Sequence, residues 1–478
     1  MSEFPKSWEA LDLSDAVINI AITDKKIPQK EYLSEGAFPV FDQGQDYVGG
    51  YTDKKEKVVD CELPAIVFGD HTRAVKFVNL PFAPGADGVK ILQPQRFFNP
   101  KLLEYFIRHI ATHLTNYGYA RHYQHLVKST IPLPPANEQH RIVTKIEELF
   151  SELDKGIENL KTAQAQLKVY RQALLKHAFE GKLTAQWREQ NRDQLETAAA
   201  LQQRIQQERA QRYQQQLADW QANGGSKPKA PKPLPPLTAE ELAELPELPE
   251  GWGWFAMGDI CLESVLGKML DKEKNKGEFK PYLRNINVRW GKFNLDDLLE
   301  MRFEDSEFVR YGLEDGDLVV CEGGEPGRCA VWRKMFGQDM QIQKALHRIR
   351  FTSSMNSSFV QMYFELCASN RRLEKLFTGT TIKHLTGEKL TRMAIPICSI
   401  DEQLQILLEL ESKFSEVDQL ELTLATSLQQ TEALRQSILK KAFSGQLVAQ
   451  DPHDEPAAAL LARIKAERTA TTGGKIRS

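Results

Sequence analysis

Several short polar segments of the 478-residue chain carry side chains that can form hydrogen bonds with the edges of nucleic acid bases. Arginine and lysine pair with guanine, asparagine and glutamine with adenine, and carboxylates accept from cytosine. The N-terminal candidates are the turn residues Asp70, His71, Thr72 and Arg73, the cation Lys76, and the later group Tyr119, Arg121 and His122. The C-terminal candidates are Arg284, Asn285, Asn287, Glu322, Glu325, Arg328, Gln341, Gln343, Lys344, Thr380, Thr381, Lys383 and His384.

Each of these segments also has a purely structural interpretation. The first turn follows an apolar strand pattern, so Asp70 can simply stabilise a hairpin. The glycine-rich run at 322–328 gives the backbone a freedom that either a close ligand or a tight hairpin would use. It lacks the G-x-x-x-x-G-K-[ST] spacing of a phosphate-binding loop. Ordinary solvated side chains explain the cationic groups around Arg121 and Lys383 equally well, although their matching placement in the two halves of the chain favours a shared role.

The sequence contains no complete catalytic or metal-binding motif. Segment 79–82 (NLPF) is similar to the Asn-Pro-Pro-aromatic motif of adenine methyltransferases, but it departs from that motif at Leu80, and no glycine-rich cofactor turn accompanies it. His109 and His113 have a zinc-ligand spacing on a helix but lack a third ligand and the glutamate of the H-E-x-x-H motif. The six cysteines include no C-x-x-C pair. We therefore predict no catalytic residue, no metal and no cofactor in this chain.

Charge and hydropathy narrow the class of protein. Lys and Arg number 62 against 65 Asp and Glu, a net charge of −3, so no bulk positive field draws the chain to nucleic acid or acidic membranes. Any DNA binding must then be local or shared with a partner. The N-terminus lacks the basic and apolar regions of a signal peptide, and no apolar run approaches the roughly 18 residues of a membrane span. These features predict a cytoplasmic protein without membrane contact.

A long internal repeat organises the chain. The segments that begin at Glu138 and Glu402 are identical at about 21 of 49 positions without a gap. Similar Ile-Pro pairs precede both segments, and similar Trp-containing segments (FPKSW and LPEGW) open the two halves. The intervening inserts share little identity, so the chain is predicted to be one repeated framework that carries two different inserts. The identical pairs of the repeat include Phe150 and Phe414, Arg171 and Arg435, and Phe179 and Phe443.

Both repeated segments have the seven-residue apolar spacing of a coiled-coil helix, as at Ile146, Leu153 and Leu160. A helix of about 40 residues is roughly 60 Å long, so these helices are predicted to serve as spacers as well as core. The inserts show strand and helix patterns, for example at 64–78 and 101–114, that are typical of mixed α/β domains.

The domain boundaries follow from these patterns. We predict α/β domains at 1–137 and 246–400, helical regions at 138–222 and 401–478, and a linker at 223–245 that is rich in Pro, Gly and Lys. The composition of the linker is typical of a solvated tether.

The repeat and its motifs resemble the specificity subunits of type I restriction-modification systems over nearly the whole chain. The most specific parts are the IPLPPANEQ and IPICSIDEQ leads into the helices, the LLKHAFEGKLTAQW and ILKKAFSGQLVAQ helix ends, and the LPEGW opening. The resemblance implies an α+β fold with an internal pseudo-two-fold repeat. Two mixed α/β target recognition domains would be separated by two long helices that form an antiparallel coiled coil. Each domain would recognise one half of an asymmetric bipartite DNA site, and the helices would set the gap.

The resemblance also implies partners. Double-stranded DNA would be bound together with two methyltransferase (M) subunits, and restriction (R) subunits would be needed for cleavage. S-adenosylmethionine, ATP and Mg²⁺ would belong to those partners. Since the helix ends occur twice, we expect them to offer two equivalent docking surfaces, formed by Phe150, Arg171, Phe179, Phe414, Arg435 and Phe443.

Two other classes of protein remain open at this point. The chain could be a methyltransferase or nuclease that carries its own recognition domains, although the catalytic motifs are missing. It could also be a coiled-coil adaptor whose α/β domains bind proteins.

Overall fold

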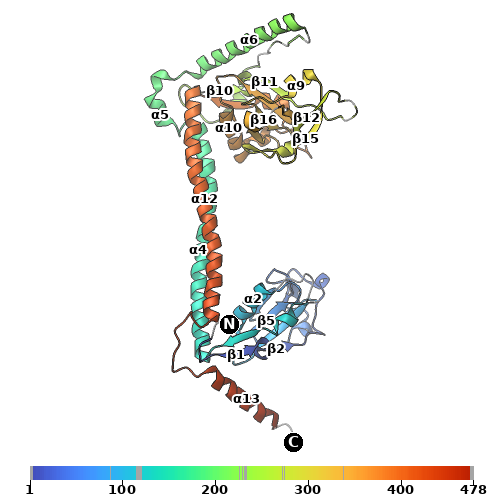
Figure 1. Ribbon diagram of the computed structural model, residues 1–478, viewed down its shortest axis with the longest axis vertical. Helices are drawn as coiled ribbons and strands as arrows, with labels where there is room; N and C mark the ends of the chain where they lie inside the picture. Colours follow the sequence, from blue (N-terminus) through green and yellow to red (C-terminus); the bar gives the residue numbers. More distant parts are fainter. Residues whose placement is uncertain are drawn as a thin grey trace. The chain divides into compact units, whose positions relative to one another are not determined.

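The computed structural model describes residues 4–473 except 87, 115–120, 225–226, 229, 231–233, 272, 274 and 337–338, and it leaves the side chains at 465 and 467–473 undescribed. The chain forms two compact units, residues 1–162 with 424–478 and residues 163–423 (Figure 1). Each unit contains one α/β domain together with one end of each long helix. Within the described residues, no helix is apolar over a length that could cross a membrane.

The first unit is built on a four-stranded antiparallel sheet of order β2-β8-β5-β6 and a three-stranded sheet of order β4-β3-β7. Ile66 and Phe68 of β5 pack with the helix α2 (Pro100–His113), whereas the alternate residue Val67 packs with Phe41 and Phe82. Because both faces of β5 are covered, its sequence is a continuous apolar run. The bounds of the remaining elements in this domain are β1 (Glu9–Asp12), α1 (Leu13–Ala16), β2 (Val17–Ile20), β3 (Phe38–Phe41), β4 (Gly50–Thr52), β5 (Ala65–Gly69), β6 (Val75–Val78), β7 (Ala83–Pro84), β8 (Val89–Pro94), α3 (Tyr123–Leu126) and β9 (Thr130–Leu133).

The second unit repeats this topology. Its four-stranded sheet has the order β11-β19-β16-β17, its three-stranded sheet the order β15-β12-β18, and β10 pairs with β20 as β1 pairs with β9. The hairpin β13-β14 and the helix α9 are additions of the second domain. The bounds are β10 (Gly253–Ala256), α8 (Met257–Ile260), β11 (Cys261–Leu266), β12 (Glu278–Leu283), β13 (Val288–Arg289), β14 (Lys292–Phe293), β15 (Leu299–Phe303), α9 (Asp305–Tyr311), β16 (Leu318–Cys321), β17 (Cys329–Val331), β18 (Gln341–Ile342), β19 (Leu346–Phe351), α10 (Ser357–Ser369), α11 (Gly387–Arg392) and β20 (Ala394–Ile397). The two inserts are thus one fold, although their sequences share little identity.

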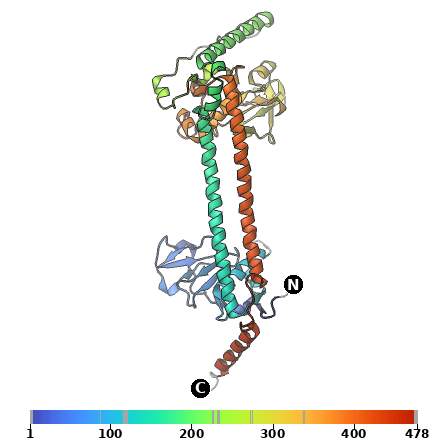
Figure 2. The same ribbon diagram turned by 90° about the vertical axis from the view of Figure 1, so that its left-hand side faces the viewer.

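The predicted coiled-coil helices are confirmed as α4 (Ala136–Phe179) and α12 (Ile400–Phe443), each of 44 residues. Gly181 and Gly445 follow them with φ of 65° and 71°, a conformation that favours glycine at a helix end. In the first unit the start of α4 lies beside the end of α12, and in the second unit the end of α4 lies beside the start of α12 (Figure 2). The helices are therefore antiparallel, as the resemblance implied.

Repeated arginines join the two helices in the same way in both units. In the first unit the Arg435 guanidinium lies 4.5 Å from the centroid of the Phe150 ring and forms an ion pair with Asp154. In the second unit Arg171 lies 4.6 Å from the centroid of the Phe414 ring and pairs with a carboxylate at the matching position, residue 418. Stacking of a guanidinium on a ring is worth about 0.5–1 kcal/mol at an exposed site. The identities at these positions are thus explained by the helix pair itself.

The last phenylalanine of each long helix packs on an α/β domain. Phe443 stacks on Phe106 of α2 with ring centroids 4.1 Å apart, and Phe179 contacts Tyr363 of α10 at 5.1 Å. Phe179 is only 2% exposed. The six residues that we expected to dock partners therefore have a role in the fold, and their docking role stays a prediction.

A buried Glu-Gln pair at the start of each long helix fastens the helix to its domain. The Trp8 indole Nε1 donates to Glu138 Oε2, and the indole of Trp252 donates to Glu402 Oε2, both at 2.9 Å. The neighbouring glutamine accepts the backbone N–H of the residue that caps α2 or α10; in the first unit, Gln139 Oε1 accepts from Asn99 at 2.6 Å. The repeated EQ dipeptide thus supplies partners for polar groups that the domain cores would otherwise bury alone.

The chain that follows each long helix contacts the α/β domain of the unit in which that helix ends. The Ala457 backbone N–H donates to the carbonyl of Ser7 at 2.9 Å, and the Ala198 N–H donates to the carbonyl of Gly251 at 2.7 Å. These alanines begin the helices α13 (Ala457–Gly473) and α6 (Ala198–Asn223), the second of which follows α5 (Ala185–Gln190). The repeated Ala-rich segments therefore occupy equivalent places on the two units.

Part of the expected linker lies against the second domain instead of forming a tether. Arg392 donates to the carbonyl of Pro236 at 2.7 Å and, through Nε, to the Glu241 carboxylate at 2.6 Å. Glu241 closes a capping box with Thr238 at the start of α7 (Ala239–Ala243). The Arg392 guanidinium lowers the pKa of Glu241 to about 2. Residues 234–246 are fixed by these polar contacts, which a composition rich in proline does not reveal.

We predict that Trp8→Phe lowers the free energy of unfolding by about 1–3 kcal/mol, because one oxygen of a buried carboxylate loses its donor. Burial already raises the pKa of Glu138, and the Trp8 hydrogen bond opposes that rise. In the variant the folded-state pKa rises further, so the loss of stability should grow as the pH rises through these folded-state pKa values, which lie above the ordinary 4.5. Urea denaturation at several pH values measures both effects. Trp187→Phe is the control, since no described residue accepts from the Trp187 indole; equal midpoints for the two variants would contradict the assignment.

We also predict that Arg392→Ala makes residues 234–246 sensitive to proteolysis under native conditions. The pairing stabilises the attached segment at pH above about 4.5, the ordinary pKa of Glu241, and is lost as the pH falls toward 2. Limited proteolysis at neutral pH with mapping of the cleavage sites is the measurement. Arg371→Ala, which removes an exposed pair with Glu374, should leave the cleavage pattern unchanged.

Candidate nucleic-acid interface

In the first domain the predicted turn connects β5 and β6 and is tied to the segment around His122. The buried Asp70 accepts the His122 N–H on its carbonyl at 2.9 Å and the Tyr123 N–H on Oδ1 at 2.7 Å. Thr72 is exposed and donates to the carbonyl of Gln43. The structure therefore brings together the two N-terminal groups of candidates, and Asp70 acts as the anchor between them.

Glu322 has the same place in the second domain. Its N–H donates to the carbonyl of Ala345 and its carbonyl accepts from Leu385, both at 2.8 Å. The corresponding groups of Asp70 bond to Gly88 and His122. One scaffold thus holds different loops in the two domains.

Four candidate segments of the second domain meet around this anchor. Arg328 Nη2 donates to the carbonyl of Asn285 at 2.8 Å, and its Nη1 lies 2.5 Å from Glu325 Oε2. A Cβ added at Gly323 would lie 3.2 Å from His384 Nδ1, so segments 322–328 and 380–384 are in close approach. The N–H of Gln343 donates to the carbonyl of Leu283 at 3.2 Å, beside the segment that contains Asn285.

The candidate residues divide into buried supports and accessible side chains. The side chains of six are buried and make contacts within the domains: Asp70, Lys76, His122, Asn287, Arg328 and Gln341. Exposed candidates that can meet a ligand directly are Thr72, Arg121, Glu325, Lys344, Thr380, Thr381, Lys383 and His384. His71, Arg73, Arg284, Asn285, Glu322 and Gln343 are intermediate. Tyr119 lies outside the described residues.

Two buried candidates have contacts that explain their residue types. Lys76 is 4% exposed and lies 3.3 Å from Asp42 Oδ1; burial lowers its pKa, and Asp42 opposes this. Asn287 donates to the carbonyls of Asn294 and Asp297, both at 3.0 Å. Because both side chains are buried, the structure does not support the expectation that they contact DNA directly.

The most exposed apolar side chain of the candidate loops was missed. Ile382 is 66% exposed in the 380–384 loop, which is closed by reciprocal backbone hydrogen bonds between Thr378 and His384. An apolar residue among hydroxyl and cationic groups fits contact with a thymine methyl group. Its position between the candidates Thr381 and Lys383 could have identified Ile382 from the sequence.

The described residues contain no cluster of three or more His, Cys, Asp and Glu side chains that could hold a metal ion. His109 and His113 lie with ring centroids 4.4 Å apart, and burial lowers the pKa of His109. Phe82 of the NLPF segment is 1% exposed and packs on Phe41. The resemblance of that segment to a methyltransferase motif is thus explained by a core aromatic residue.

Sequence comparison finds similar proteins of one family. Residues 5–162 match the family described as type I restriction modification DNA specificity domain. The chain is 26% identical over 358 residues to the type I restriction enzyme EcoKI specificity subunit of Escherichia coli K12, an alignment that covers 72% of this chain and 65% of that subunit. It is 21% identical over 512 residues to the StySPI specificity subunit of Salmonella potsdam, covering 99% of this chain and 98% of the relative.

The fold is also found in solved structures. A chain from a study of complex assembly in a type I R-M system aligns with a TM-score of 0.62 and 16% identity, covering 93% of this chain and all of that one. The HsdS subunit of Thermoanaerobacter tengcongensis aligns with a TM-score of 0.51 and 16% identity over 93% of this chain and 98% of its own. The chain is thus similar in sequence to type I restriction-modification specificity subunits, and its fold is that of the solved chains of this class.

The division into supports and accessible residues predicts opposite effects of two alanine substitutions. Asn287→Ala should lower the free energy of unfolding by about 1–3 kcal/mol, because the buried Asn287 side chain bonds to the carbonyls of Asn294 and Asp297 and to the Arg284 N–H. Lys383→Ala should change it by less than about 0.5 kcal/mol. Urea denaturation compares the two, and an equally large loss for Lys383→Ala would show that the 380–384 loop also has a structural role.

Proposed function

We propose that this chain is the DNA sequence-specificity subunit of a type I restriction-modification complex and is itself not catalytic. The observation that carries the proposal is the repeated scaffold: Asp70 and Glu322 make the same backbone contacts, yet hold loops of different length and composition. Two equivalent domains with different loops suit an asymmetric site of two half-sequences. Base edges in the major groove supply the distinct donor and acceptor patterns that such loops would recognise.

The helices α4 and α12 would set the gap between the half-sites and carry two methyltransferase subunits, with restriction subunits added for cleavage. Two copies of each helix end and of the Ala-rich segment support two docking places on one chain. The net charge of −3 supports a partner contribution to the DNA-binding cleft, because affinity depends on the number of phosphates neutralised. S-adenosylmethionine, ATP and Mg²⁺ would be bound by those partners.

Exchange of one domain tests the proposal. Replacing residues 1–137 by the first domain of another specificity subunit should change one half of the DNA motif and leave the other half and the gap unchanged, because the two domains lie in separate compact units. The motif is measured by selecting bound sequences from random duplexes with the chain and its methyltransferase subunits. A change in both halves would contradict independent recognition.

The control is the unexchanged complex in the same selection. If it enriched no sequence, the proposed function itself would be wrong, whereas methylation by the purified chain alone would show that it is an enzyme. Deleting whole helical turns from both α4 and α12 should shorten the gap without changing either half-sequence.

A further inference from the structure

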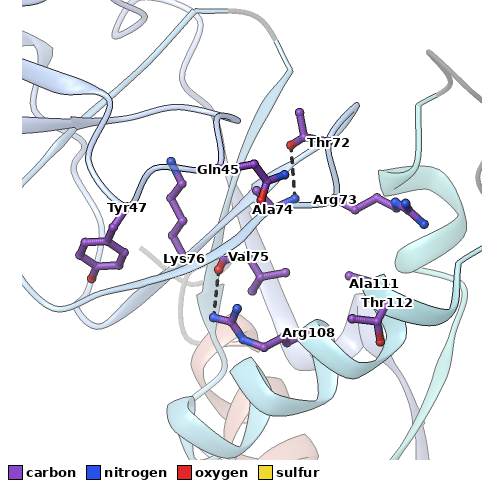
Figure 3. A pocket seen from close by; sticks show the side chains of 10 residues that line it. All are labelled: Gln45, Tyr47, Thr72, Arg73, Ala74, Val75, Lys76, Arg108, Ala111 and Thr112. Atoms are coloured by element: carbon purple, nitrogen blue, oxygen red, sulfur yellow. Dashed lines mark hydrogen bonds between the residues drawn. The ribbon is translucent and has the colours of Figure 1, made fainter. Parts of the chain in front are cut away.

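A cavity of about 360 Å³ lies in the first domain between the β5-β6 hairpin and α2 (Figure 3). It adjoins the turn that holds Thr72, and it extends that candidate site to residues that have been assigned no function. Its lining is Gln45, Tyr47, Thr72, Arg73, Ala74, Val75, Lys76, Arg108, Ala111 and Thr112.

The cavity carries an excess of positive charge. Its lining contains three cations and no carboxylate. Lys76 is balanced by Asp42, but Arg108 shares Glu104 with Lys101. Arg73 has no acidic partner among the described residues, and its Nη1 donates to the carbonyl of Leu114 at 2.8 Å. An anion is the ligand that this charge would attract.

Arg108 is held so that part of its guanidinium faces the cavity. Its Nε donates to Glu104 Oε1 at 2.7 Å and its Nη2 to the carbonyl of Val75 at 3.0 Å (Figure 3). Nη1 makes no hydrogen bond to the part of the chain that is described. The side chain is half exposed, so these two bonds orient it without burying it. A fixed, planar guanidinium is well suited to bind a phosphate.

Arg73 has a backbone conformation that arginine rarely adopts. Its φ is 62°, and its N–H donates to the carbonyl of Gly69 at 2.8 Å. In the second domain the equivalent bond, from Gly327 to the carbonyl of Cys321 at 2.9 Å, is made by a glycine with φ of 86°. The turn therefore needs no arginine for its shape. Strained conformations of this kind cluster at functional sites.

At the described positions equivalent to Arg73 and Arg108, the second domain carries no cation. Asn99 and Asn356 cap α2 and α10, and nine residues after each cap stand Arg108 and Glu365. Glu365 accepts from Gln361, and burial raises its pKa. Glycine and glutamate thus occupy the places of the two arginines, and the feature belongs to the first domain alone.

We propose that the Arg73-Arg108 cavity binds one phosphate group of the DNA backbone in the first half-site and so fixes the register of the first domain on the duplex. The proposal rests on the proposed DNA recognition and names a phosphate, which carries no base identity, as the group bound. Charged hydrogen bonds from a guanidinium to a phosphate are stronger than neutral ones, and Gln45 can add an amide donor.

Arg73→Gly and Arg108→Gln test the proposal in the full chain assembled with its methyltransferase subunits. Each variant should bind the cognate duplex roughly tenfold more weakly, with the same sequence preference. The slope of log affinity against log salt concentration should fall by about one. Arg73→Gly places in the turn a residue that readily adopts its positive φ, so the urea midpoint of this variant should not fall. Arg96→Gly makes the same change of charge at an 86% exposed site beyond the other end of β8, and it should alter neither affinity nor slope.

Duplexes with single neutral methylphosphonate linkages identify the group bound. For the unaltered complex, one neutral linkage in the first half-site should lower the affinity as much as either substitution does. For each variant, the same linkage should cause no further loss of affinity. A changed base preference would overturn the proposal in favour of base recognition. Competition by inorganic phosphate without any sensitive linkage would assign the cavity to a free anion and would also overturn it. Sequence-specific binding that neither variant weakens removes this inference alone, whereas no sequence preference in the unaltered complex removes the proposed function.

Discussion

Each α/β domain completes its core with the start of one long helix and the end of the other. In the first unit Ile142 and Ile146 of α4 are buried in the same cluster as Ile438 and Leu439 of α12. In the second unit Leu174 and Leu175 of α4 share a cluster with Ile406 and Leu410 of α12. Neither domain is therefore an appendage on a finished coiled coil.

This constraint explains why the repeat is most exact at the helix ends. Glu138 and Glu402 each need an indole donor because their carboxylates are buried, and Phe179 and Phe443 each need an aromatic neighbour on α2 or α10. The two helices have equal lengths of 44 residues, so a deletion in one alone would move its end contacts out of register with the other. In the proposed function, this dependence of each helix on the other would keep the gap between the half-sites constant.

The residues that hold the candidate loops are separate from the loops themselves. The backbone contacts of Asp70 and Glu322 are repeated, whereas the loops between Gly69 and Ala74 and between Cys321 and Arg328 differ in length, charge and glycine content. Loops of this kind can change without disturbing the sheet because their anchors bond through backbone atoms. A residue of any type at the anchor position could make these backbone hydrogen bonds. The Asp70 side chain accepts one further hydrogen bond, from the Tyr123 N–H.

The repeat, the two long helices and the β5-β6 hairpin could be predicted because each leaves a periodic or identical pattern in the sequence. The shared topology of the inserts could not be predicted from the sequence. Strand order depends on long-range pairing, which requires apolar residues at alternating positions but not identical residues. Polar residues in loops were expected to be accessible, but Asn287 and His122 are buried because the loops fold back on their own carbonyls. The attachment of residues 234–246 depends on Arg392, which lies some 150 residues away in sequence.

In the proposed function, one chain presents two independent recognition domains, the two long helices set the gap between the half-sites, and the partner subunits carry out the chemistry. Methylation mapping of host DNA with and without this chain is the most direct measurement. We predict that the chain is required for methylation of a motif with two dissimilar halves separated by a constant number of unspecified bases. A single uninterrupted motif, a variable gap, or an unchanged methylation pattern after loss of the chain would contradict the account.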